Sequence, residues 1–167
     1  MLPTIRNILF AAGLGNDTSY VLNHALNLAQ KHDARIYVIH SHEALNIPDQ
    51  SMAEIYMLQE GIEDAFEKSL LDTEAKVRAY LEEVCQSVLN KNFAAPELIA
   101  DIRVSRHTPK AAILAAAEEF DVDLIVMGSH RHFVLADALL GTTTMKILHS
   151  AKVPVLVVRI PQEIPTD

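Results

Sequence analysis

Residues 123–130 read DLIVMGSH, and residues 141–144 read GTTT. The apolar run of the first segment stops at Gly128, and the second segment stands where a short helical stretch begins. A buried strand that runs into a glycine, a loop and a hydroxyl-rich helix start favours phosphate binding. Backbone N–H groups converge at such a place, and the helix dipole adds partial positive charge. We therefore expect the function of this chain to reside in this segment.

The length and composition predict one folded domain. The chain has 167 residues, half of them hydrophobic, which suits a single packed core better than two domains or a disordered chain. We expect this domain to span residues 1–167, with a loose tail at 161–167 that contains two prolines.

Charge and composition argue against several classes of function. The net charge is −8, aromatic residues make up 5% and Trp is absent, so the chain lacks the basic face and the stacking groups of a nucleic-acid binder. The same charge disfavours docking on an anionic membrane.

No apolar run reaches the ~20 residues that span a bilayer, and the first residues do not form a signal-peptide pattern. A single cysteine, Cys85, cannot form an internal disulfide. These features predict a soluble, cytoplasmic protein that binds neither nucleic acid nor membrane.

Short apolar runs alternate with helical stretches along the chain. The apolar runs predict strands at residues 5–12, 35–42, 98–105, 123–128 and 153–160. Helical spacing predicts helices at 18–31, 52–89, 109–120 and 142–150. This alternation predicts a parallel sheet with helices on both faces, in which ligands bind at the carboxyl ends of the strands.

Three local features of the helices carry further expectations. Asp17 or Thr18 is expected to cap the first helix with its side chain. The long second helix carries an acidic run, which we interpret as a solvated face. Cys85 lies on the same helix and is expected to be a buried structural thiol.

The chain resembles the universal stress protein family. The resemblance rests on residues 8–12, on 123–130, on Gly141 and Thr142, and on the run VPVLVV at residues 153–158. It implies a three-layer, doubly wound α/β fold like that of the adenine nucleotide alpha hydrolases, with five parallel strands in the order 3-2-1-4-5. It also implies a homodimer in which the last strand pairs with its twin, which agrees with the need to cover an apolar sheet edge. The interface residues would be Val153, Val155, Leu156, Val157 and Val158.

The nucleotide-binding branch of the family has the pattern Gly-x2-Gly-x9-Gly-Ser/Thr. Gly128, Gly141 and Thr142 keep this spacing, but the middle position is Arg131 and a further glycine of many relatives is Val134. Arg131 either fills the cradle or clamps a phosphate with its guanidinium. Two other positions also depart from the branch. Gly13 stands where an Asp contacts the nucleoside, and Ser41 stands where an apolar residue packs on adenine.

The resemblance therefore predicts a site for ATP or AMP, with Mg²⁺ as a companion of ATP. The candidate binding residues are Ala12, Gly13, Ser41, Met127, Gly128, His130, Arg131, Gly141, Thr142, Thr143 and Thr144. The phosphate end of this site is largely retained, whereas the nucleoside end is altered.

Histidines offer a different hypothesis, because several fall at the carboxyl ends of strands. A metal site or a pH-sensitive pocket is one interpretation, and ordinary loop histidines are the other. No tight ligand spacing supports a metal. The histidines concerned are His40, His42, His107, His130 and His132.

The favoured function is that of a stress-response protein that acts as a sensor or regulator by binding an adenine nucleotide. The alternative is a family member that binds no nucleotide and serves as a dimeric interaction module for an unidentified protein partner. Slow ATP hydrolysis is a third class of function, but no general base is evident, and no nucleophile elbow surrounds Ser129.

Overall fold

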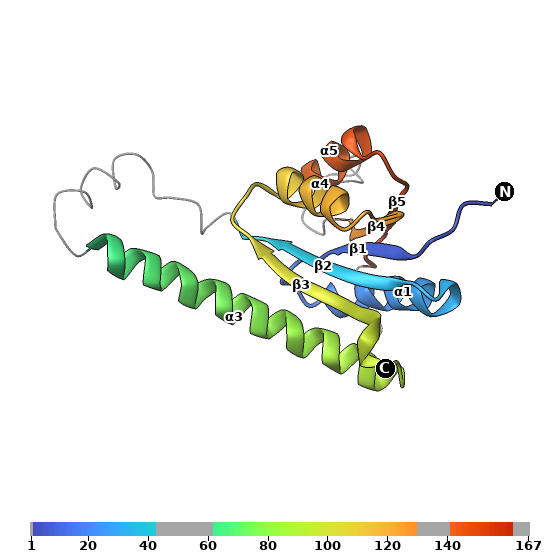
Figure 1. Ribbon diagram of the computed structural model, residues 1–167, viewed down its shortest axis with the longest axis horizontal. Coiled ribbons are helices and arrows are strands. Elements are labelled where there is room, and N and C mark those ends of the chain that lie inside the picture. Colours follow the sequence, from blue (N-terminus) through green and yellow to red (C-terminus); the bar gives the residue numbers. More distant parts are fainter. Residues whose placement is uncertain (1, 43–61, 130–140, 162–167) are drawn as a thin grey trace.

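The computed structural model describes residues 2–42, 62–129 and 141–161, which form a five-stranded sheet with helices on both sides (Figure 1). All strand pairs are parallel, and the order is β3-β2-β1-β4-β5, as predicted. The strands are β1 (Asn7–Ala11), β2 (Arg35–Ser41), β3 (Ile99–Ser105), β4 (Leu124–Gly128) and β5 (Val155–Val158). The helices are α1 (Thr18–His32), α3 (Ile62–Lys91), α4 (Pro109–Glu119) and α5 (Thr142–Ser150), with a 3-10 turn η2 (Pro96–Leu98).

Two apolar cores fill the spaces between the three layers. Ile8 and Phe10 of β1 pack toward α1 and α3, whereas Leu9 packs in the second core with residues of α4 and α5. This division follows from the alternation of side chains along a strand, which sends neighbouring residues to opposite faces. Figure 1 shows α1 and α3 on one side of the sheet and α4 and α5 on the other. The inner strands are therefore apolar on both faces, as expected of a parallel sheet.

The strands are shorter than the apolar runs that predict them, and Asp123 shows why. Its carboxylate accepts hydrogen bonds from the backbone N–H groups of Arg6 (2.7 Å) and Asn7 (3.0 Å). Asp123 therefore serves as a clamp at the amino end of the sheet, and β4 begins one residue later.

The long helix α3 ends at Lys91. Residues 52–61 of the helix predicted at 52–89 lie outside the described part of the chain.

The capping prediction at the start of α1 is wrong in its detail. Asp17 occupies the N-cap position, but its side chain makes no capping hydrogen bond. Its backbone is helical (φ −85°, ψ −9°), whereas side-chain capping normally requires an extended residue. Thr18 instead turns back to the preceding loop, where its hydroxyl lies 3.0 Å from the carbonyl oxygen of Gly13 and 2.8 Å from that of Gly15.

The long helix agrees with the expectation for Cys85 and adds contacts to the acidic run. Cys85 is buried, and burial, followed by the charge of Glu82, raises the pKa of its thiol to about 11, as suits a structural cysteine. Glu67, Glu82 and Glu83 of the acidic run are exposed, as a solvated face requires, and two members of the run also form ion pairs. Arg106, just after β3, forms ion pairs of 3.2 Å with both Glu67 and Glu74, so two of these carboxylates fasten α3 to the sheet. None of the helices in the described ranges has the length and apolar character needed to cross a membrane.

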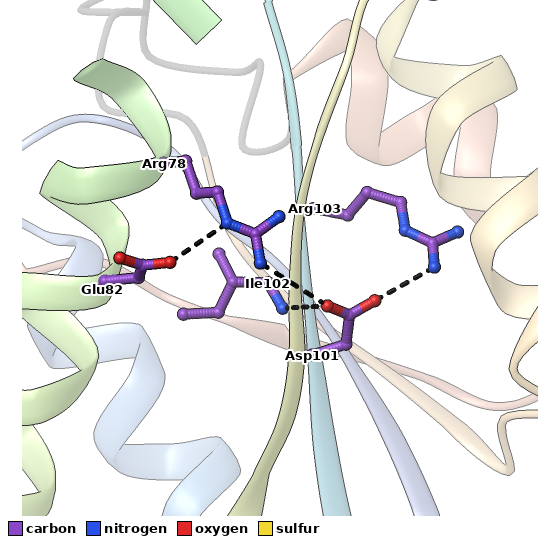
Figure 2. Close-up of polar contacts among 5 residues, drawn as sticks. All are labelled: Arg78, Glu82, Asp101, Ile102 and Arg103. Atoms are coloured by element: carbon purple, nitrogen blue, oxygen red, sulfur yellow. Dashed lines mark hydrogen bonds and ion pairs between the residues drawn. The ribbon is translucent and has the colours of Figure 1, made fainter. Parts of the chain in front are cut away.

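A line of charged side chains crosses the outer strand β3 (Figure 2). Arg78 of α3 contacts Glu82 at 3.0 Å and Asp101 at 3.9 Å, and Asp101 contacts Arg103 at 3.0 Å. Asp101 also accepts a hydrogen bond from the backbone N–H of Ile102 (2.9 Å). On the far side, Arg103 pairs with Glu119 at 2.6 Å. We call these side chains the β3 ion network: Arg78, Glu82, Asp101, Arg103 and Glu119.

Candidate functional site

A cavity of about 280 Å³ opens at the carboxyl ends of β1, β2 and β4. This is the topological switch point of the sheet, because the connections that follow β1 and β4 lead to opposite edges, and ligands of such folds commonly bind there. The cavity brings together most of the residues that the sequence nominates. These are Ala12, Gly13, Ser41, Met127, Gly128, Gly141, Thr142, Thr143 and Thr144. The predicted residues His130 and Arg131, and the departure at Val134, lie outside the described residues.

The start of α5 forms one wall of the cavity. Its first helical hydrogen bond runs from the N–H of Met145 to the carbonyl of Gly141 (3.0 Å). The N–H groups of Thr142, Thr143 and Thr144 precede this bond and therefore have no acceptor within the helix. Gly141 is the N-cap residue and supplies no side-chain oxygen to them. Three backbone donors and three hydroxyls are thus available beside the cavity, next to the positive end of a helix.

Gly128 lies in a tightly packed place between α1 and the chain after β5. A Cβ atom at this position would lie 3.0 Å from both Ile160 Cδ1 and Val21 Cγ2. The next residue, Ser129, accepts a hydrogen bond from the N–H of Ile160 (3.1 Å) through its hydroxyl, and its own N–H donates to Val158. The glycine and serine of this motif therefore hold the chain after β5 against α1, which is a structural role that the sequence analysis did not assign.

The end of the cavity at Ser41 differs from the pattern that the resemblance implies. The Ser41 hydroxyl donates to the carbonyl of His107 (2.6 Å), so it holds the loop between β3 and α4 in place. The apolar surface missing at Ser41 comes instead from Ile39, Ile113 and Val21, which also line the cavity. Sequence reasoning missed these three, since helix and strand periodicity marks them only as core residues.

His40 is a buried histidine at this end of the sheet. Its Nδ1 lies 2.8 Å from the carbonyl oxygen of Ala12, and because a carbonyl only accepts, Nδ1 carries the proton. Nε2 is buried and has no hydrogen-bond partner among the described residues. Burial lowers the pKa of His40, the bond to Ala12 partly offsets this, and the nearby His42 lowers it further. The neutral imidazole is therefore the form that fits this site.

The histidines do not form a metal centre within the described ranges. His40 and His42 have ring centroids 5.7 Å apart, but no group of three His, Cys, Asp or Glu side chains in residues 2–42, 62–129 and 141–161 is arranged to hold a metal ion. His130 and His132, which the metal hypothesis also includes, fall outside these ranges.

Asp17 is a cavity residue that sequence reasoning treated only as a helix cap. It lines the cavity from the start of α1. The signal that would have found it is the loop Gly13-Leu14-Gly15-Asn16-Asp17, in which a carboxylate follows two glycines at the end of a buried strand.

The sheet order, the cavity at the switch point and the open start of α5 together define a three-layer α/β protein with a small-molecule cavity. Within this class, the chain belongs to the universal stress protein family, whose model matches residues 4–159.

Individual relatives agree with this assignment. The chain is 34% identical to the "Universal stress protein A homolog 2" of Coxiella burnetii over 162 residues, which cover 95% of this chain and 98% of that protein. The solved structure of the universal stress protein UspA from Lactobacillus plantarum has a similar fold, with a TM-score of 0.71 and 19% identity over 95% of this chain and 100% of that one. A universal stress protein solved in complex with cAMP has a TM-score of 0.64 and 16% identity, over 94% of this chain and 98% of that one.

Proposed function

We propose that this universal stress protein binds an adenine nucleotide, ATP or AMP, in the cavity at the carboxyl end of its sheet. The observation that carries the proposal is the start of α5, whose first N–H groups have no acceptor within the helix and border the cavity. Backbone donors at a helix start are a general phosphate-binding device. A structurally similar universal stress protein was solved with cAMP, an adenine nucleotide, which supports the ligand class.

In this proposal the phosphates lie against the segment 128–144, and the base lies against the apolar side chains that line the opposite wall. ATP would bring Mg²⁺ with it, because the ion neutralises the charge of adjacent phosphates. The protein then acts as a sensor or regulator whose nucleotide-bound and free forms differ, without the need for turnover. A reducing compartment such as the cytoplasm suits the unpaired thiol of Cys85.

Calorimetric titration with ATP, AMP and cyclic AMP tests the proposal, and Thr142→Pro is the sharpest variant. Proline is favoured at the first helical position, where it removes one N–H without a cost to folding. Gly141 already has the extended conformation that a residue before proline needs (φ −63°, ψ 158°). Loss of one charge-assisted hydrogen bond should weaken nucleotide binding by about tenfold. Thr142→Ala keeps the N–H and is the matched control, for which we expect a smaller loss.

Arg131→Gly completes the test, because it restores the glycine of the nucleotide-binding branch. Binding that appears only in this variant would show that the arginine closes the cavity. Binding by the native chain that Thr142→Pro leaves unchanged would place the phosphates elsewhere. If the native chain binds none of the three nucleotides, the proposal fails and the interaction-module alternative gains.

We also propose a homodimer through β5. Its strand is apolar, Leu156 on it remains 37% exposed, and among the described strands β5 pairs only with β4. An open apolar edge of this kind commonly pairs with a second chain. The same surface supports the alternative function, in which a dimer engages an unidentified protein partner.

A further inference from the structure

The carboxylate of Asp17 has no evident role in the fold. Asp17 is half-buried at the start of α1 and lines the cavity. Its side chain makes no capping bond. Within residues 2–42, 62–129 and 141–161, no hydrogen bond or ion pair reaches its carboxylate. A cavity-lining acceptor is thus left available.

The preceding loop is shaped around this carboxylate. A Cβ atom on Gly15 would collide with Oδ1 of Asp17, so only glycine leaves room for the carboxylate in its present position. The Thr18 hydroxyl, which bonds to the carbonyls of both Gly13 and Gly15, holds the same loop in place. The loop therefore brings the carboxylate beside the cavity without using it as a helix cap.

The chemistry of the site limits what such a group can contact. An ionised carboxylate only accepts hydrogen bonds, and it repels the phosphates that the start of α5 attracts. Its partner must therefore be a cation or a neutral donor, and in AMP without Mg²⁺ the available donors are the sugar hydroxyls and the base amine. Asp17 is half-buried, whereas the deeper wall is apolar, with Ile39 and Ile113. The sugar lies between phosphate and base in any nucleotide, so a carboxylate at this intermediate depth fits the sugar.

We propose that the Asp17 carboxylate binds the ribose of the nucleotide, accepting hydrogen bonds from its 2′- and 3′-hydroxyls. This inference rests on the proposed function. It names a residue for the sugar contact, which Gly13 cannot make because it has no side chain. The position that carries a nucleoside-contacting Asp in similar proteins is a glycine here, and Asp17 supplies a carboxylate to the same cavity from the next helix. The positive end of α1 stabilises its charge.

The test compares ligands with and without the sugar hydroxyls on matched variants. Calorimetry measures binding of AMP, 2′,3′-dideoxy-AMP and inosine monophosphate to the native chain, to Asp17→Ala and to Asp17→Asn. We expect Asp17→Ala to weaken AMP binding by about tenfold, as the loss of a hydrogen bond to a charged group predicts, and to leave dideoxy-AMP binding unchanged. Asp33→Asn is the control. It removes the same charge at the opposite end of α1, at a left-handed position that asparagine tolerates.

Gly15→Ala provides a second, independent variant. Its methyl group must displace the Asp17 carboxylate, so it should weaken AMP binding in the native background and have no further effect in Asp17→Ala. Circular dichroism and the melting temperature establish that each variant is folded.

Each result decides a different point. If AMP binds to the native chain and to Asp17→Ala equally well, the Asp17 assignment is overturned while the proposed function stands. If the loss in Asp17→Ala disappears with inosine monophosphate rather than with the dideoxy ligand, Asp17 contacts the base amine and the ribose assignment is wrong. If the native chain binds no nucleotide, both proposals fail.

Discussion

The two outer strands of the sheet differ in charge: β3 carries charged side chains, and β5 is apolar. The β3 ion network crosses β3, and within it the carboxylate of Asp101 accepts a hydrogen bond from the backbone N–H of Ile102 (Figure 2). Strand β5 carries four apolar residues and no charge. Edge strands expose unpaired backbone groups, and charged side chains placed on an edge discourage pairing with another chain. Among the described residues, charges on β3 therefore discourage pairing with a further strand, whereas β5 carries none.

The aromatic contacts reinforce the charged edge at β3. The guanidinium of Arg103 lies 4.5 Å from the ring centre of Phe120, and this ring stacks on Tyr37 of β2 at 4.4 Å. A cation held over an aromatic ring and paired with two carboxylates has little freedom to leave the edge. Nothing comparable lies on β5, so the asymmetry supports the proposed dimer at that strand.

The largest expected effect comes from Val155→Pro at the apolar edge. The carbonyls of Pro154 and Val158 accept bonds from β4, at 3.0 and 2.8 Å, so the backbone groups of Val155 point to the outer side. Proline there removes an outward N–H and leaves pairing with β4 intact. We expect the mass measured by light scattering to fall from two chains to one. Val155→Ala keeps the N–H and should remain a dimer. An unchanged mass in Val155→Pro would exclude β5 as the contact.

Asp101→Ala should have an intermediate effect, on stability at the charged edge. It removes the acceptor of the Ile102 N–H and the partner of Arg103, which should lower the free energy of unfolding by about 1–2 kcal/mol. Urea denaturation measures this change. Arg78→Ala is the control. It removes a half-exposed ion pair of the same network, which is worth about 0.5 kcal/mol or less. Equal losses in the two variants would show that the backbone contact of Asp101 contributes nothing.

The smallest effect on stability is expected when the pH is lowered and His40 becomes protonated. His40 lies on β2, beside Val104 of β3. Its pKa is lower in the folded chain than the ~6.5 of an unfolded chain. Between these two values only the unfolded chain binds the proton, so stability is complete above about pH 6.5 and falls as the pH drops. His40→Asn keeps a donor for Ala12 and should flatten this dependence in urea denaturation measured between pH 7.5 and 5. An identical slope in both proteins would assign the effect to other groups.

The fold was predictable from the sequence to a large degree, and particular residues show why. The apolar run before Gly128 and the helical spacing of residues 18–31 are local patterns, and burial on both faces of a parallel sheet leaves a strong local signal. The strand order came from the resemblance to the universal stress protein family. The ends of the elements were less predictable, because Asp123 and Asp17 act through contacts with distant or irregular backbone.

Some features of the candidate site were also predictable from the sequence, and others were not. The sequence by itself determined that glycines and threonines gather at the carboxyl end of the sheet, because these residue types and their spacing follow from chain connectivity. Only the tertiary structure decided that Gly128 serves packing against Val21 and Ile160, that Ser41 holds a loop, and that the Asp17 carboxylate stands unused beside the cavity. The tertiary structure also decided which edge of the sheet carries the ion network. The physical reason is that close approach and charge pairing join residues far apart in the chain, which no local pattern records.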